Sequence, residues 1–214
     1  MTDARGRSTD LVRGGVVVAG GAVTVALPQT FPADGGPTAA DRAVAAPIHS
    51  ALDAHPGIYH ALVIPSNGYI VLPLLVAGVA WFLYRRRWWC AATLAVVPEL
   101  VVAINTLVLK PLWERPLHDY LAYPSGHTVQ LVAVATAFVL LTDSRRARRI
   151  TVALGAIALV LVAIGMIGLG YHLATDIAGG TAAAIAMTTA LVWCAALLRA
   201  AAVRFSPARR HSRR

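Results

Sequence analysis

The stretch that decides the fold is ITVALGAIALVLVAIGMIGLGY, residues 150–171. It contains no charged side chain, and it is bounded by Arg149 on one side and His172 on the other. A helix needs about 20 consecutive apolar residues to cross a bilayer. This stretch therefore predicts a membrane-spanning helix.

Five other runs of the chain are also apolar and poor in charge. Three are about as long as the first, the run that begins at His127 is shorter, and the one nearest the N-terminus is short and glycine-containing. No repeat or low-complexity segment divides the chain, so we expect a single domain over residues 1–214. The fold class that follows is all-α, an integral membrane six-transmembrane-helix bundle. Its predicted spans are residues 14–27, 61–84, 88–109, 127–142, 150–171 and 177–198.

Composition agrees with a membrane protein. Hydrophobic residues make up 57% of the 214 residues and charged residues only 14%, whereas an average soluble chain is roughly 45–50% apolar and about 25% charged. The only two cysteines, Cys90 and Cys194, both lie inside apolar runs. A disulfide scaffold is therefore excluded, and we expect both thiols in the core.

The first predicted span has an alternative interpretation as a signal peptide, because a basic start precedes a short apolar run. We favour an uncleaved helix. Asp3 and Asp10 lie where a signal peptide would be basic, and no small-x-small cleavage site follows.

The distribution of arginine predicts the orientation, because cytoplasmic loops near helix ends collect Lys and Arg. With six spans, every Lys and Arg except Arg42, Lys110 and Arg115 falls on one side, and the net charge of +9 is concentrated there. We therefore expect a multi-pass protein of the plasma membrane with both termini in the cytoplasm. The basic tail, residues 199–214, is then an anchoring end, and no nucleic-acid partner is expected. Residues 28–60 form a long outer loop, in which residues 41–54 are predicted to be an amphipathic surface helix.

Polar residues gather at the outer ends of the later spans. Two cations, two imidazoles and a carboxylate at one membrane face suit a phosphorylated substrate: the cations hold phosphoryl oxygens, one base attacks, and another group protonates the leaving oxygen. The residues concerned are Lys110, Arg115, His127, His172 and Asp176.

Each of these residues also has a simpler interpretation. Ser125 is a natural N-cap for the helix that begins after Pro124-Ser125-Gly126-His127, although a helix N-terminus is itself an anion site. His172 and Asp176 are four positions apart, on one face of a helical turn, so Asp176 either orients the imidazole or only caps the last span. The alternative interpretation of Lys110 and Arg115 is as interface residues, with Glu114 and Asp119 nearby to neutralise them.

Glu99 is the one carboxylate in the interior of a predicted span, where an ionised group costs roughly 2.5–3.5 kcal/mol. It lies about three helical turns before Lys110 and so on the same face. We expect it to hydrogen-bond within the bundle near Asn105. Transport of a proton or ion through Glu99 is the competing hypothesis.

Read in order, these residues resemble the type 2 phosphatidic acid phosphatase superfamily of integral-membrane lipid phosphatases. The family pattern is a Lys, six residues and Arg-Pro; then Pro-Ser-Gly-His; then Ser-Arg, five residues, a His, three residues and an Asp. Residues 124–127 match completely, and His172 with Asp176 matches the last pair. Arg115 follows Lys110 after four residues, so the family arginine falls on Leu117. The Ser-Arg positions of the third part fall on Gly165 and Met166.

The resemblance implies roles for individual residues. His172 is the nucleophile that forms a phosphohistidine, Asp176 orients it, and His127 protonates the leaving group. Phosphate-binding residues are Lys110, Arg115, Ser125 and Gly126. No metal ion or other cofactor is implied, because the fixed cations of the protein hold the phosphoryl oxygens in place of a metal ion.

These observations predict a phosphatase that faces the outside and acts on a lipid phosphate or diphosphate, such as a polyprenyl carrier or a phosphatidyl lipid. Its partners are that substrate and membrane lipids, and the aromatic residues Trp113, Tyr120 and Tyr123 are candidates for an acyl or interface contact. Two other hypotheses remain: a transporter built on Glu99, and a weakened homologue that binds lipid phosphate without turnover.

Overall fold

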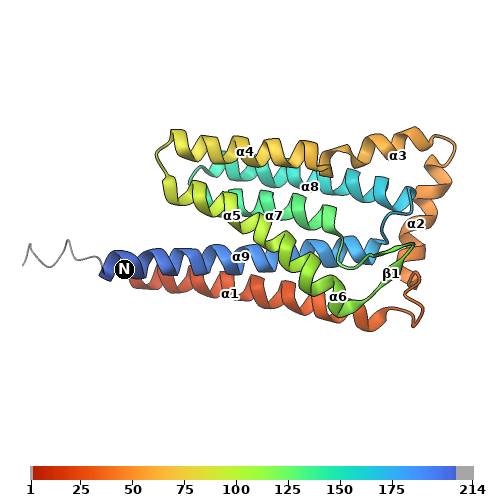
Figure 1. The fold of residues 1–214 in the computed structure, drawn as a ribbon, viewed down its shortest axis with the longest axis horizontal. Helices are drawn as coiled ribbons and strands as arrows, with labels where there is room; N and C mark the ends of the chain where they lie inside the picture. The colour runs from red at the N-terminus through yellow and green to blue at the C-terminus, as the bar shows by residue number, and fades with distance from the viewer. Residues whose placement is uncertain (1, 206–214) are drawn as a thin grey trace, which may run out of the picture.

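The computed structural model describes residues 2–205, which form a bundle of helices that run along one axis (Figure 1). The elements are α1 (Thr2–Ala26), η1 (Leu27–Thr30), α2 (Ala39–Leu52), α3 (Pro56–Val63), η2 (Ile64–Ser66), α4 (Gly68–Tyr84), α5 (Trp88–Ile104), the π-helical η3 (Asn105–Leu109), α6 (Lys110–Trp113), β1 (Pro116–Leu117), β2 (Tyr120–Leu121), α7 (Gly126–Leu141), α8 (Arg145–Gly168) and α9 (Ala174–Phe205).

The prediction of an all-α membrane bundle is confirmed. Five helical segments are long and apolar enough to cross a bilayer, and α7 is a shorter apolar helix. All six predicted spans are helical, although their ends differ from the prediction. The largest difference is at α1, which begins at Thr2 and not at residue 14. The helix α8 ends at Gly168, and the chain then turns at Gly170 with a φ of +67°. The chain is a multi-pass membrane protein.

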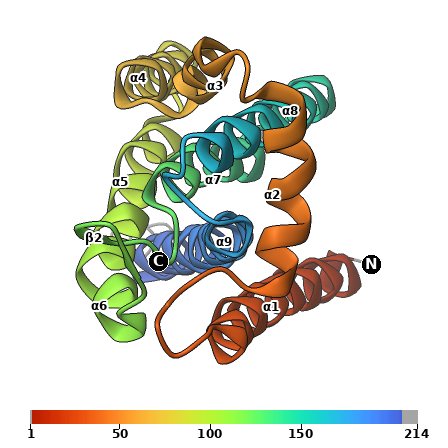
Figure 2. The same ribbon diagram turned by 90° about the vertical axis from the view of Figure 1, so that its right-hand side faces the viewer.

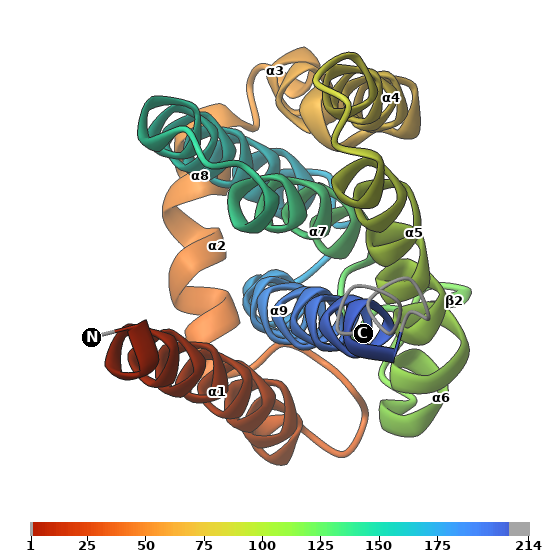
Figure 3. The ribbon, with the colours of Figure 1, turned by 90° about the vertical axis from the view of Figure 1, so that its left-hand side faces the viewer.

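The centre of the bundle is α7, which packs against α4, α5, α8 and α9. Its inward positions are small, and Val129, Ala133 and Ala137 are fully buried, which lets the neighbouring helices approach closely. Figure 3 shows α9 lying between α1 and α7. Cys90 is buried in this core, but Cys194 is exposed, so the expectation of a second core thiol is wrong.

One end of the bundle is crossed by α2, which is the surface helix predicted over residues 41–54 (Figure 2). A capping box starts it: the Thr38 hydroxyl accepts from the Asp41 N–H, and the Asp41 carboxylate accepts from the Thr38 N–H. The same end carries α6, the β1–β2 hairpin and the connection from α8 to α9 (Figure 1). We call it the site end. The other end, which carries the α4–α5 and α7–α8 connections, is called the basic end.

Glu99 lies on an exposed face of α5, so the expectation of a hydrogen bond inside the bundle near Asn105 is wrong. The two residues are six positions apart, which at 3.6 residues per turn points them in different directions. Asn105 is buried, and its Nδ2 donates to the Pro124 carbonyl at 3.4 Å. The π-helical turn Asn105–Leu109 then changes the register before Lys110, so Glu99 and Lys110 do not keep the expected common face.

Candidate active site

The structure brings the predicted site residues to the site end, from three separate parts of the chain. Lys110 begins α6, and Arg115 follows that helix. Ser125 precedes α7, and Gly126 and His127 form its first turn. His172 lies in the connection before α9, and Asp176 lies in the first turn of α9.

Arg115 is a buried cation at this end, with only 2% of the residue exposed. Its Nη1 donates to Asp176 Oδ1 at 2.8 Å and to Thr175 Oγ1 at 2.7 Å. Its Nη2 donates to Gly36 O at 2.9 Å and to Asp41 Oδ2 at 3.3 Å. Nε donates to Gly35 O at 3.0 Å. All five guanidinium donors are therefore used within the chain, in an arrangement that we call the Arg115 clamp.

Phe31 completes the clamp, since its ring lies 3.7 Å from the Arg115 guanidinium carbon. A guanidinium stacked on an aromatic face gains a cation–π interaction. The clamp thus joins the loop before α2, α2 itself, the segment after α6 and the start of α9. Glu114 and Asp119, the expected neutralising residues, form no ion pair with Arg115 within residues 2–205.

Asp41 is the second buried carboxylate of the clamp, and the sequence analysis did not single it out. It accepts hydrogen bonds from the Thr175 N–H at 2.8 Å and the Thr175 hydroxyl at 3.1 Å. Burial alone would raise the pKa of Asp41, but hydrogen bonds from the backbone and hydroxyls of Thr175 and Thr38 outweigh it and lower the pKa below its ordinary value. Asp41 is therefore an ionised partner for Arg115.

His172 and Asp176 face each other, as predicted, but not along one face of a helical turn, because His172 lies outside α9. Nδ1 of His172 is 3.7 Å from Asp176 Oδ2. This nitrogen is buried and has no hydrogen-bond partner in the described chain. Asp176 Oδ2 instead accepts from the Leu173 N–H at 2.9 Å. Asp176 thus both caps the start of α9 and faces the imidazole, so the two interpretations of this residue are compatible.

The loop before α7 is fastened directly to the start of α9. The Ser125 N–H donates to the Asp176 carbonyl at 3.1 Å. Ser125 occupies the N-cap position of α7, but its side chain makes no capping hydrogen bond, so the expectation of a serine cap is wrong. The buried hydroxyl contacts Met166 Sδ at 3.9 Å and accepts from the Thr128 hydroxyl at 3.1 Å.

Two glycines of α9 let this loop approach closely. A Cβ on Gly179 would lie 2.1 Å from the Tyr123 ring, and one on Gly180 would lie 3.0 Å from the Ser125 carbonyl. Tyr123 is fully buried, and its hydroxyl donates to Thr24 O at 2.6 Å. Tyr123, a candidate for an acyl or interface contact, is thus buried and packs the loop against α1 and α9.

His127 and Lys110 form the more open side of the site. His127 is exposed and lies within electrostatic range of His172 and Lys110. The Lys110 ammonium donates to the Leu121 carbonyl and lies 6.0 Å from the centre of the Tyr120 ring. Lys110 is therefore held beside the hairpin, on the same side of the site as the two imidazoles.

Tyr120 covers His172, with their ring centres 6.0 Å apart in an edge-to-face arrangement. Burial, followed by the negative charges of Asp176 and Asp119, raises the pKa of the Tyr120 phenol. The phenol therefore stays protonated and donates to the Tyr171 carbonyl. His118 adds a contact to Gly170 O at 3.2 Å, so the hairpin is attached to the loop that carries His172.

The two positions that depart from the family pattern lie close to this site. Leu117 pairs with Tyr120 in the hairpin, and Met166 is fully buried against Ser125. An apolar side chain therefore stands at each position where the family pattern has an arginine. Among residues 2–205, no group of three or more His, Cys, Asp or Glu side chains is arranged to hold a metal ion.

The family model described as PAP2 superfamily matches residues 109–199, which contain every predicted site residue. The crystal structure of a transmembrane PAP2-type phosphatidylglycerolphosphate phosphatase from Bacillus subtilis is similar with a TM-score of 0.63 and 20% sequence identity, over 83% of this chain and 94% of that chain. At this identity the likeness shows a shared fold. No curated protein matches the sequence.

The resemblance seen in the sequence is thereby confirmed: residues 109–199 match the PAP2 superfamily model, and the fold is similar to that of a PAP2-type phosphatase.

Proposed function

We propose that the chain is a membrane phosphatase that hydrolyses a phosphomonoester or diphosphate of a lipid. The observation that carries this proposal is the fastening of the Pro-Ser-Gly-His loop to the His172–Asp176 pair by the hydrogen bond from Ser125 N–H to Asp176 O. It holds the start of α7 beside the imidazole. A lipid headgroup lies at the depth where such helix ends emerge from a bilayer.

The proposed reaction uses two imidazoles. Nδ1 of His172 faces Asp176, which leaves Nε2 to attack phosphorus. The bond from phosphorus to the leaving oxygen breaks, its electron pair stays on that oxygen, and His127 supplies the proton. Water then attacks the phosphohistidine, the phosphorus–nitrogen bond breaks, and the proton from water returns to His127.

Phosphate binding is proposed for Lys110 and for the backbone N–H groups at Gly126 and the first turn of α7, where a helix N-terminus favours an anion. The structure changes our expectation for two other residues. Arg115 has no free donor, because all five are used in the clamp. The Ser125 hydroxyl is fully buried. We assign both residues to holding the site together.

The structurally similar protein from Bacillus subtilis is a phosphatidylglycerolphosphate phosphatase, so a phosphatidyl lipid is one candidate substrate here. A polyprenyl diphosphate is the other candidate. The arginine distribution supports cytoplasmic termini and a site end that faces outward. We propose a reaction without a metal ion, in which Lys110 and backbone N–H groups balance the phosphoryl charge.

The test is phosphate release by purified protein in detergent from phosphatidic acid, phosphatidylglycerolphosphate and a polyprenyl diphosphate, each with and without EDTA. His172→Asn should abolish release, whereas His60→Asn, which changes an exposed histidine on α3, should not. Release that is unchanged in His172→Asn would overturn the nucleophile assignment. Loss of release in EDTA would overturn metal independence.

A second candidate is a homologue that binds lipid phosphate without turnover, favoured by the apolar residues Leu117 and Met166 at arginine positions. Loss of an oxyanion-binding donor costs about 10²–10³ in rate. Binding of the lipids above without release would support this candidate. The transporter hypothesis loses its basis, because Glu99 faces away from the bundle interior.

A further inference from the structure

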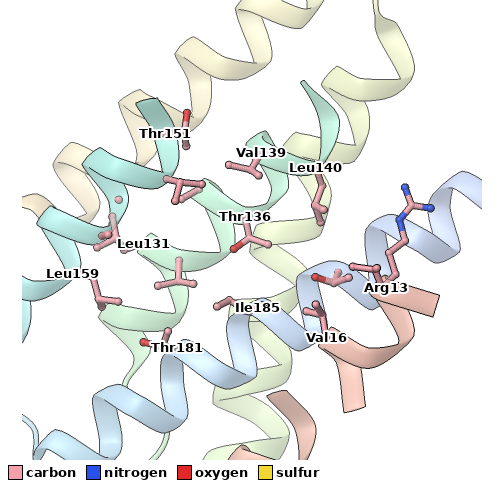
Figure 4. A pocket seen from close by; sticks show the side chains of 17 residues that line it. Arg13, Val16, Leu131, Thr136, Val139, Leu140, Thr151, Leu159, Thr181 and Ile185 are labelled. Atoms are coloured by element: carbon pink, nitrogen blue, oxygen red, sulfur yellow. The ribbon is translucent and has the colours of Figure 1, made fainter. Parts of the chain in front are cut away.

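An apolar pocket of about 350 Å³ lies between α1, α7, α8 and α9. Figure 4 shows the side chains that line it, among them Val16, Leu131, Leu159 and Ile185 from the four helices. Ligand pockets typically measure about 300–1,000 Å³. In a chain that spans a bilayer, this lining suits a hydrocarbon chain.

The pocket continues into a second cavity of about 540 Å³ at the basic end. Both cavities are lined by Arg13 and Leu140, so they adjoin at these two residues. Arg87, Arg199 and Trp89 also line the second cavity. The apolar pocket therefore ends at a mouth lined by three arginines.

The mouth carries a net positive charge. Arg13 is paired with Asp10 at 3.3 Å, and Arg87 with Asp143 at 2.9 Å. Arg199 is exposed and forms no ion pair within the described residues. A neighbouring cavity of about 420 Å³ adds the exposed Arg86 and Trp88.

The aromatic residues of the mouth indicate the depth at which it lies. Trp88 is 66% exposed and Trp89 is 39% exposed. Tryptophan is enriched at membrane–water interfaces, where its ring lies at the level of lipid headgroups. Basic pockets between spanning helices at this level are suited to anionic headgroups.

We propose that the apolar pocket and its basic mouth together bind one anionic phospholipid. Its phosphate lies among Arg13, Arg87 and Arg199, and one acyl chain lies in the apolar pocket. The two parts require a ligand with a negative head and a hydrocarbon tail. The mouth lies at the basic end, opposite the α8–α9 connection (Figure 1), and the lining of the apolar pocket extends from Arg13 to Leu131 and Thr181. The headgroup is therefore bound away from the proposed catalytic residues, and the site does not depend on the proposed reaction.

The test measures lipid binding to delipidated full-length protein by native mass spectrometry and by thermal unfolding. The probes are phosphatidylglycerol and phosphatidylcholine with identical acyl chains, and inorganic phosphate alone. We expect one phosphatidylglycerol to bind more tightly than phosphatidylcholine, and phosphate alone to give no stabilisation. Stabilisation by phosphate alone, or equal binding of the two lipids, would overturn the proposal.

Two pairs of variants separate the head from the tail. The double variant Arg13→Gln/Arg199→Gln should lower the preference for the anionic lipid by about tenfold or more. Its control, Arg145→Gln/Arg149→Gln, makes the same charge change in α8 outside both cavities and should keep the preference.

Ala156→Phe fills the pocket from an exposed position and should weaken the binding of both lipids. Ala153→Phe is exposed on the same helix but lies outside the pocket, and it should weaken the binding of neither lipid. Equal effects within either pair would show diffuse attraction and overturn the site.

Discussion

The arginines at the two ends of the bundle differ in burial and in ion pairing. At the site end, Arg115 is 2% exposed, pairs with two carboxylates and stacks on Phe31. At the basic end, Arg86 and Arg199 are exposed and form no ion pair in the part of the chain that the structure describes. The same side chain is therefore a structural component at one end and an available charge at the other.

The difference shows that net charge alone is a poor guide to where an anion binds. Arg115 was a natural candidate for a phosphate ligand because it lies beside the site residues. Enclosure by Asp41, Asp176, Thr175 and two carbonyls removes it from that role, since a guanidinium has only five donors. In the proposed function the phosphate is therefore held by Lys110 and backbone N–H groups, and the exposed arginines of the basic end remain open to other anions.

The largest effect is expected from Arg115→Gln. This change leaves Asp41 and Asp176 buried without their cation, and removing one partner of a buried ion pair costs about 3–5 kcal/mol. The measurement is the free energy of unfolding in detergent. Arg42→Gln removes a charge from an exposed arginine at the same end and should change little. Equal losses in the two variants would contradict the clamp.

A smaller effect is expected from Asp41→Asn, which removes a charged acceptor but keeps its shape. Hydrogen bonds to charged groups contribute about 1.5–3 kcal/mol. Because the pKa of Asp41 is lowered in the folded chain, its contribution is complete above the ordinary value of 3.8 and is lost as pH falls through the lower folded pKa.

The pH dependence therefore separates charge from shape at Asp41. The stability difference between wild type and Asp41→Asn should be constant at neutral pH and should shrink below about pH 4. Unfolding measured across this range checks it. A difference that does not change with pH would show that the carboxylate charge is unimportant.

Tyr120→Phe should have a modest effect, since it removes only the hydroxyl that donates to the Tyr171 carbonyl. A neutral hydrogen bond contributes about 0.5–1.5 kcal/mol. Hydrogen exchange of the loop around His172 should rise more than exchange in the helices. If exchange in that loop is unchanged, the hairpin does not hold it.

The smallest effect is expected at the basic end. Arg86→Gln should change the free energy of unfolding by no more than about 0.5 kcal/mol in lipid-free detergent, as for most exposed substitutions. The loss of free energy of unfolding should therefore be much smaller in Arg86→Gln than in Arg115→Gln. A loss of several kcal/mol would mean that Arg86 is also part of a buried network.

Much of the architecture could be predicted from the sequence, because uncharged runs and the arginine pattern are local signals. The Pro-Ser-Gly-His loop and the His172–Asp176 pair could also be recognised as patterns, since each lies within a few positions, and the structure places them side by side. Asp41 was missed as a site residue because its partners Arg115 and Thr175 are 74 and 134 positions away. Its only local signal, the capping box with Thr38, indicates a helix start and nothing about a clamp.

The errors have physical causes as well. A periodicity of 3.6 residues contains no π-helical turn, so the relation of Glu99 to Lys110 was wrong. Nor does an apolar run show which side of a helix meets lipid, so Cys194 was placed in the core although it is exposed. Both errors concern the face of a helix on which a residue lies, which a local pattern alone does not determine.

The central proposal, that His172 is the nucleophile of a lipid phosphatase, is tested most directly by quenching with alkaline denaturant during turnover of a lipid substrate with a ³²P-labelled phosphoryl group. Wild-type protein should carry an acid-labile, base-stable label on His172, and His172→Asn should carry none and lose at least about a thousandfold in rate. A label that persists in His172→Asn, or turnover that this variant retains, would contradict the account.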